Sequence, residues 1–118
     1  MEYNLEERTA VFGEKIITLV RKLPNDSVNK RLIEQVVGSA GSIGANYCEA
    51  NESESKKDFI HKMGISKKEI KETKHWLRLI AQANPDFITE CRDNWKEAQE
   101  LLLIFSKIIT SCRNKNQI

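Results

Sequence analysis

The chain is poor in residues that interrupt helices, with two prolines and five glycines in 118 residues. Its three cysteines, Cys48, Cys91 and Cys112, form no C-x-x-C pair, which argues against a disulfide framework or a zinc site. No apolar run approaches the roughly 20 residues that a membrane-spanning helix needs. Residues 1–7 contain three glutamates and lack the apolar segment of a signal peptide. We therefore expect a cytoplasmic protein with no membrane partner.

Neither sign of charge is in large excess, because 19 Lys and Arg residues face 17 Asp and Glu residues, giving a net charge of +2. This balance is too small to imply nucleic-acid binding by itself, so any basic surface must come from local clustering. With 31% charged and 40% hydrophobic residues, the composition is that of a soluble globular protein. The length suits one core, and we expect residues 1–118 to form a single domain.

Apolar residues recur every three or four positions in four segments, which predicts four helices. The breaks between them are the turn at Leu23-Pro24, the polar residues 51–55 and the turn at Asn84-Pro85. The predicted helices span about residues 5–22, 27–51, 55–83 and 86–113. Short connections make consecutive helices antiparallel, so we predict an all-α, up-down-up-down four-helix bundle.

The fourth predicted helix has the most regular apolar pattern. A seam with alternating steps of three and four contains Ile88, Cys91, Trp95, Ala98, Leu102, Phe105, Ile109 and Cys112. Leu101, Ile104 and Ile108 widen this seam on one side. An apolar face of this width indicates more than one packing contact, so we expect the protein to self-associate.

Small residues crowd the middle of the second predicted helix, where Gly38, Gly41 and Gly44 follow one another at steps of three. Each glycine costs about 1 kcal/mol against alanine in a helix interior, so we expect another helix to approach this segment closely. The spacing also resembles a phosphate-binding loop. No strand precedes it and no Gly-Lys-Ser/Thr follows, which argues against that interpretation.

Polar residues at steps of three and four share one face of the same helix: Ser39, Ser42, Asn46 and Glu49. Buried polar groups need partners, and Glu72 and Thr73 on the third helix are candidates. We interpret this set, with Glu72, as a structural network that fixes helix register.

The motifs for chemistry are weak. Glu72-x-x-His75 matches half of a di-iron motif, but the other histidine, His61, lies on the same helix about 21 Å away. No histidine has the sequence context of a nucleophilic triad, and a helical bundle offers no obvious oxyanion hole. We therefore expect no metal, no cofactor and no enzymatic activity.

Two charged stripes lie on the third and fourth helices. The basic stripe contains Lys67, Lys71, Lys74 and Arg78, and the acidic stripe contains Asp86, Glu90, Asp93, Glu97 and Glu100. In an antiparallel hairpin, Arg78 would lie near Glu90 and Lys71 near Glu97, so one interpretation is pairing within the chain or between subunits. The other interpretation is a track that binds RNA or DNA.

Several motifs together resemble a known family. They are Leu23-Pro24, Gln35, Ser39-x-x-Ser42-Ile43-x-x-Asn46-x-x-Glu49-Ala50, Asp58-Phe59-Ile60 and Glu72-Thr73-x-x-Trp76-Leu77-x-Leu79-Ile80. Over roughly residues 10–110 the chain resembles the four-helix-bundle proteins of intervening sequences in bacterial 23S rRNA genes. Tyr47 departs from that pattern, which has an aliphatic residue there.

The resemblance implies a barrel-like homopentamer. From the features above we expect a non-enzymatic, oligomeric scaffold or adaptor that binds nucleic acid, and the resemblance also implies an alternative function. A related branch is the accessory protein of diversity-generating retroelements, which binds a reverse transcriptase and RNA or DNA through a basic surface. The biochemical role of most members is not implied by the resemblance.

Overall fold

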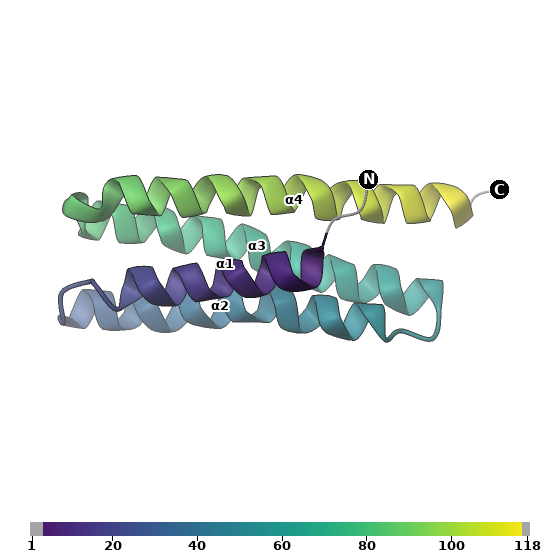
Figure 1. Ribbon diagram of the computed structural model, residues 1–118, viewed down its shortest axis with the longest axis horizontal. Helices are drawn as coiled ribbons and strands as arrows, with labels where there is room; N and C mark the ends of the chain where they lie inside the picture. Colours follow the sequence, from purple (N-terminus) through teal and green to yellow (C-terminus); the bar gives the residue numbers. More distant parts are fainter. Residues whose placement is uncertain (1–3, 117–118) are drawn as a thin grey trace.

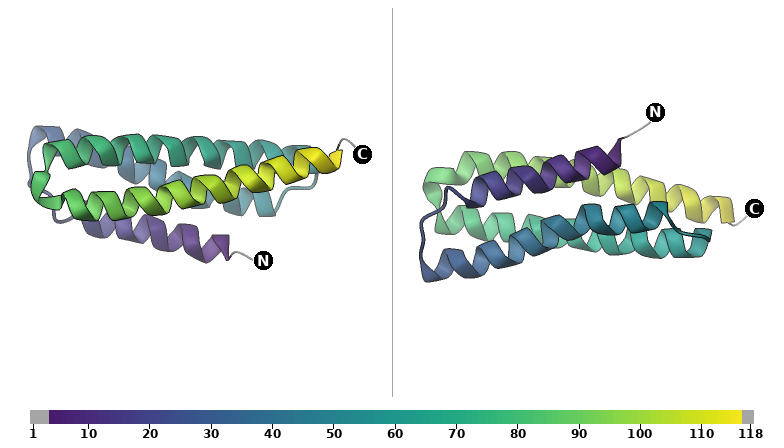
Figure 2. Two further views of the ribbon diagram at one scale, coloured as in Figure 1. Left: turned by 90° about the horizontal axis from the view of Figure 1, so that it is seen from above. Right: turned by 60° about the horizontal axis from the view of Figure 1, so that its bottom comes forward.

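The computed structural model describes residues 4–116 and consists of four long helices and one short 3₁₀ helix (Figure 1). The elements are α1 (Leu5–Val20), α2 (Ser27–Asn51), α3 (Lys56–Ala83), η1 (Pro85–Phe87) and α4 (Ile88–Asn116). Successive helices run antiparallel, and α4 returns beside α1, as Figures 1 and 2 show from three sides. The described part of the chain has no strand. The predicted all-α four-helix bundle is confirmed.

Local polar side chains determine where the first three helices begin. Each is preceded by a residue whose side chain accepts a hydrogen bond from the backbone N–H three positions on: Asn4 from Glu7, Asp26 from Asn29 and Ser55 from Asp58. Ser55 therefore caps α3, which begins at Lys56, one residue after the predicted start at residue 55. The last helix begins at Ile88 because Pro85 opens η1 instead.

The core runs along the axis of the bundle. Its largest fully buried apolar side chains include Phe12, Ile16, Ile43, Met63, Ile70, Leu77, Leu101 and Phe105. Tyr47 of α2 packs edge-on against Phe105 of α4, with ring centroids 5.7 Å apart. The aromatic ring at this position thus bridges two diagonally opposed helices. None of the helices within residues 4–116 has both the length and the apolarity needed to cross a membrane.

The buried face of α4 is rotated relative to the predicted seam. Cys91, Ala98 and Phe105 are buried as expected, but the side chain of Trp95 is 38% exposed. Leu101 is fully buried instead. The prediction that Trp95 belongs to the core seam is wrong, because the core lies on the Leu101 side of the helix.

Candidate nucleic-acid interface

Of the four basic residues predicted on one face of α3, Lys74 and Arg78 lie beside α4. Lys74 is the best-anchored of them, because its Nζ donates a hydrogen bond to Oε1 of Gln99 and lies 4.4 Å from the ring centroid of Trp95. Lys71 and Arg78 are exposed, and Lys67 and Lys74 are half-buried. All four side chains of this basic stripe are therefore at least partly accessible.

Two arginines of α4 extend this basic surface. Arg92 lines the same hollow as Arg78 near the α3–α4 turn, and Arg113 lines a hollow with Lys68 toward the other end. We call the combined surface the cationic face, defined as Lys67, Lys71, Lys74, Arg78, Arg92 and Arg113. Sequence reasoning missed Arg92, because it stands beside acidic residues in the sequence while its side chain lies on another side of the helix.

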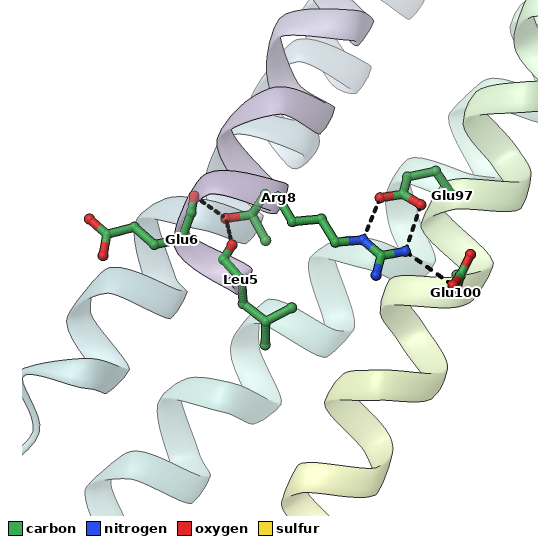
Figure 3. A network of polar contacts seen from close by, with 6 residues as sticks. Leu5, Glu6, Arg8, Glu97 and Glu100 are labelled. Carbon is green, nitrogen blue, oxygen red and sulfur yellow. Dashed lines mark hydrogen bonds and ion pairs between the residues drawn. The ribbon is translucent and has the colours of Figure 1, made fainter. Parts of the chain in front are cut away.

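Three acidic residues of α4 pair with Arg8 of α1 and Lys22 of the turn after it, and not with α3. Nε and Nη2 of Arg8 each donate a hydrogen bond of 2.8 Å to the carboxylate of Glu97, and Nη2 lies 3.3 Å from Glu100 (Figure 3). The hydrogen bonds that Arg8 donates to Glu97 raise the pKa of Arg8 above its ordinary value. In the same way, Nζ of Lys22 lies 3.0 Å from Glu90. The acidic side of α4 thus closes the bundle against α1.

This arrangement contradicts the predicted pairing within the α3–α4 hairpin. Glu90 pairs with Lys22 of the α1–α2 turn instead of Arg78, and Glu97 pairs with Arg8 of α1 instead of Lys71. Within residues 4–116, none of the four α3 cations has a carboxylate oxygen within ion-pair distance. No carboxylate of residues 4–116 therefore compensates their positive charge by direct contact.

The predicted polar set of α2 is divided between different partners. Ser39 is buried; its Oγ accepts a hydrogen bond of 2.9 Å from Oγ1 of Thr73 on α3, as the register hypothesis expected of that pair. A second buried hydroxyl of α3, that of Ser66, donates to the carbonyl oxygen of Ile43 at 2.9 Å. Sequence reasoning missed Ser66, although its spacing of seven from Thr73 places both on one face.

The remaining members of the set do not join that contact. Ser42 and Asn46 donate to carbonyl oxygens of their own helix. Glu49 pairs with Lys62 of α3 at 3.1 Å on the surface. Glu72 is exposed.

Glu69 of α3 lies close to Glu72 and to the hydroxyl of Ser42. Burial raises the pKa of the Glu69 carboxyl, and the neighbouring Glu72 raises it further, while Ser42 acts in the opposite direction. The α2–α3 seam therefore has one acidic group that holds its proton more tightly than a free carboxyl does.

Of the three glycines of α2, only Gly44 is approached closely. A Cβ added there would lie 3.0 Å from Oγ1 of Thr9 on α1, whose hydroxyl donates to the carbonyl oxygen of Leu5. A Cβ added at Gly38 or Gly41 would meet nothing within 4 Å in the described structure. The expected close approach is thus correct at Gly44 and wrong, within one chain, at the other two positions. The polar residues Ser42 and Asn46 also do not share this α1 contact.

An open groove of about 450 Å³ runs between α1 and α2. We call it the apolar groove; its small and apolar lining residues include Ala10, Gly13, Ile17, Val37, Gly41 and Ala45. Ile17 and Val37 are 44% and 37% exposed. The groove therefore presents an unfilled hydrocarbon surface on the side of the bundle made by the first two helices.

Groups for covalent or metal chemistry are not brought together in the described part of the chain. No three His, Cys, Asp or Glu side chains of residues 4–116 are placed to hold a metal ion. Burial raises the pKa of the Cys91 thiol to about 11, which keeps it protonated near neutral pH.

The fold defines the class as a small, all-α four-helix-bundle protein. More specifically, the chain belongs to the 23S rRNA-intervening sequence protein family, whose sequence pattern matches residues 2–110. Among solved structures it is similar to a protein with unknown function from the S23 ribosomal protein family of Bacteroides thetaiotaomicron VPI-5482. That similarity has 29% identity and a TM-score of 0.80, and covers 88% of this chain and 96% of the other. No curated protein matches the chain.

Proposed function

We propose that the protein is a non-enzymatic, self-associating scaffold that binds RNA or DNA through the cationic face. The observation that carries this proposal is the separation of charge on α4. Arg8 of α1 and Lys22 of the turn after α1 pair with three carboxylates of that helix, while the basic stripe of Lys67, Lys71, Lys74 and Arg78 on α3 has no carboxylate partner within residues 4–116. A continuous, uncompensated row of cations is the electrostatic requirement for phosphate binding.

The length of the row suits a nucleic-acid backbone. Lys67 and Arg78 are eleven residues apart on one helix, which corresponds to about 17 Å at 1.5 Å per residue. Phosphate contacts by lysine and arginine position a nucleic acid without reading its sequence. Binding through this face should therefore be tolerant of sequence and sensitive to salt.

Self-association is the second part of the proposal, and the apolar groove supports it. We propose that a helix of a second copy of the chain fills this groove, because its small side chains permit close packing of helices. A ring of five copies is the assembly that the family resemblance implies. Repeating the cationic face around such a ring would strengthen weak binding by avidity.

The charge-reversal variant with Glu at Lys67, Lys71 and Lys74 tests the nucleic-acid interface. Its affinity for labelled structured RNA and for duplex DNA at low salt should fall at least tenfold, because three phosphate contacts become repulsive. The matched control has Glu at Arg21, Lys30 and Arg31, which are exposed residues of α2 and of the turn before it. This control changes the net charge by the same amount and should retain most of the binding.

Two results would contradict the proposal. Equal losses in the two charge-reversal variants would mean that net charge, and not the cationic face, governs binding. Failure of the wild-type protein to bind at low salt would leave a scaffold for proteins alone. For the assembly, light scattering should give a mass several times 13.6 kDa, and a monomer at micromolar concentration would remove that part of the proposal.

A further inference from the structure

A hollow of about 320 Å³ lies at the end of the cationic face that is nearest the α3–α4 turn. Its apolar lining comes from Leu77, Ala81, Ile88 and Cys91. Arg78 of α3 and Arg92 of α4, both exposed, also line it. The volume falls at the lower end of the roughly 300–1,000 Å³ typical of small-molecule sites, so it suits one flat group rather than a helix.

Trp95 completes the lining of this hollow and has an unusual environment. With 38% of its surface accessible, it is more exposed than any other Phe, Tyr or Trp of residues 4–116. The ammonium of Lys74 lies 4.4 Å from its ring centroid, and Gln99 holds that ammonium by a hydrogen bond. Lys74 itself does not line the hollow. The indole is therefore fixed beside one cation and still presents surface to the hollow between two others.

An exposed aromatic ring within a row of cations is the combination that single-stranded nucleic acids require. The ring stacks on any unpaired base, and the cations hold the phosphates on either side of it. A duplex can reach the cations but not the ring, because its bases are stacked on one another inside the helix. The hollow should therefore favour single strands over duplexes, whereas the rest of the cationic face should bind both.

We infer that the hollow takes an unpaired nucleobase, stacked on the indole of Trp95, with the flanking phosphates held by Arg78 and Arg92. This inference rests on the proposed function and refines it, because it names single-stranded nucleic acid as the ligand at this end of the face. The rest of the face contacts phosphates of either paired or unpaired strands.

Tryptophan fluorescence provides a direct test. The chain has two tryptophans, so the variant Trp76→Phe leaves Trp95 as the only indole. At low salt, a short oligouridylate should quench this fluorescence, because the stacked base contacts the ring. A duplex RNA of the same length should bind with little quenching.

Affinity measurements with Trp95→Ala provide the second readout. Binding of the oligouridylate should weaken by about 5- to 150-fold, which is the range expected from the loss of one base-stacking contact. Binding of the duplex should change less than twofold. Trp95→Phe keeps an aromatic ring and should recover much of the lost affinity, provided that circular dichroism shows all variants to be folded. Leu103→Ala changes another exposed apolar residue of α4 and should affect neither ligand.

The outcomes separate this inference from the proposed function. Equal weakening of single strand and duplex in Trp95→Ala, or no quenching by a bound oligouridylate, would overturn the stacking site and leave the cationic face as a phosphate-binding surface. Binding of neither ligand by the wild-type protein at low salt would overturn both. Loss of oligouridylate binding in Trp95→Phe as severe as in Trp95→Ala would also count against stacking.

Discussion

Two of the seams of the bundle, α1–α2 and α3–α4, are built from opposite chemistries. Between α1 and α2, the seam is lined by residues such as Gly13, Ile17 and Gly41 and forms the apolar groove. Between α3 and α4, long basic side chains and Trp95 line the outer side. The first surface can gain stability only from contact with other apolar groups, and the second mainly from negative charge. One small bundle thus offers two surfaces that should respond to solution conditions in opposite ways.

The arrangement of α4 explains why the difference is so sharp. Its acidic side is turned toward α1, where Arg8 holds Glu97 and Glu100 and Lys22 holds Glu90. Negative charge is thereby kept away from the α3–α4 seam. Closing the bundle and exposing the cationic face are two consequences of the same helix rotation.

The largest expected effect is that of salt, which should weaken nucleic-acid binding much more than assembly. If four phosphates are contacted, raising monovalent salt from about 50 to about 200 mM should weaken nucleic-acid binding roughly 100-fold, because counterion release is lost. Assembly through the apolar groove should weaken little over this range, since burial of apolar surface does not depend on screening. Fluorescence anisotropy and light scattering on the same samples measure both. A parallel loss of mass and binding would mean that the two surfaces are not independent.

Two glycines of α2 allow the apolar groove to be tested separately from the packing of α1. Gly44→Leu should lower the free energy of unfolding by about 1–3 kcal/mol, because the new side chain meets Thr9. Gly41→Leu meets nothing within 4 Å in one chain and should keep the fold while lowering the oligomer mass. Urea unfolding and light scattering give the two quantities. An unchanged mass for Gly41→Leu would show that no second copy occupies the groove.

The helical architecture was predictable because its signals are local in sequence. Pro24 and Pro85 interrupt the chain, and the steps of three and four between apolar residues indicate helices without knowledge of their partners. The rotation of each helix about its axis is not local. Steps of three and four placed Trp95 in the seam, whereas the actual core lies toward Leu101.

The candidate surfaces were harder to predict, for the same reason. The basic stripe of α3 was found from spacing alone, but its lack of carboxylate partners depends on Arg8, which is 89 residues from Glu97. Gly44 and Gly41 look equivalent in the sequence, and only the position of Thr9 distinguishes them. Patterns within one helix thus indicate which residues share a face, while contacts between helices decide what that face meets.

Removing the bidentate ion pair of Arg8 tests the link between bundle closure and the cationic face. Arg8→Met should lower the free energy of unfolding by about 1 kcal/mol, because a half-buried, charge-assisted pair is lost. It should also weaken nucleic-acid binding slightly, since Glu97 and Glu100 become uncompensated. Lys22→Met, at a more exposed pair, should cost about 0.5 kcal/mol or less. Equal stability of Arg8→Met and wild type in urea would show that α1 is held by apolar contacts alone.

The smallest expected effect concerns Glu69, on the α2–α3 seam that separates the two surfaces. Because burial and Glu72 raise the pKa of Glu69 in the folded state, the native protein holds this proton more tightly than the unfolded chain does. Its contribution to stability is therefore present below the ordinary carboxyl pKa of 4.5 and declines as pH rises through the higher native pKa. Glu69→Gln cannot ionise, so its unfolding free energy should match that of wild type at acidic pH and exceed it slightly at neutral pH. Urea unfolding of both proteins between about pH 4 and pH 7 measures the difference.

Glu34→Gln, at an exposed position of α2, controls for the loss of one negative charge. A wild-type protein that becomes the more stable of the two as pH rises would show that the Glu69 carboxylate is favoured in the folded state, contrary to its position between α2 and Glu72.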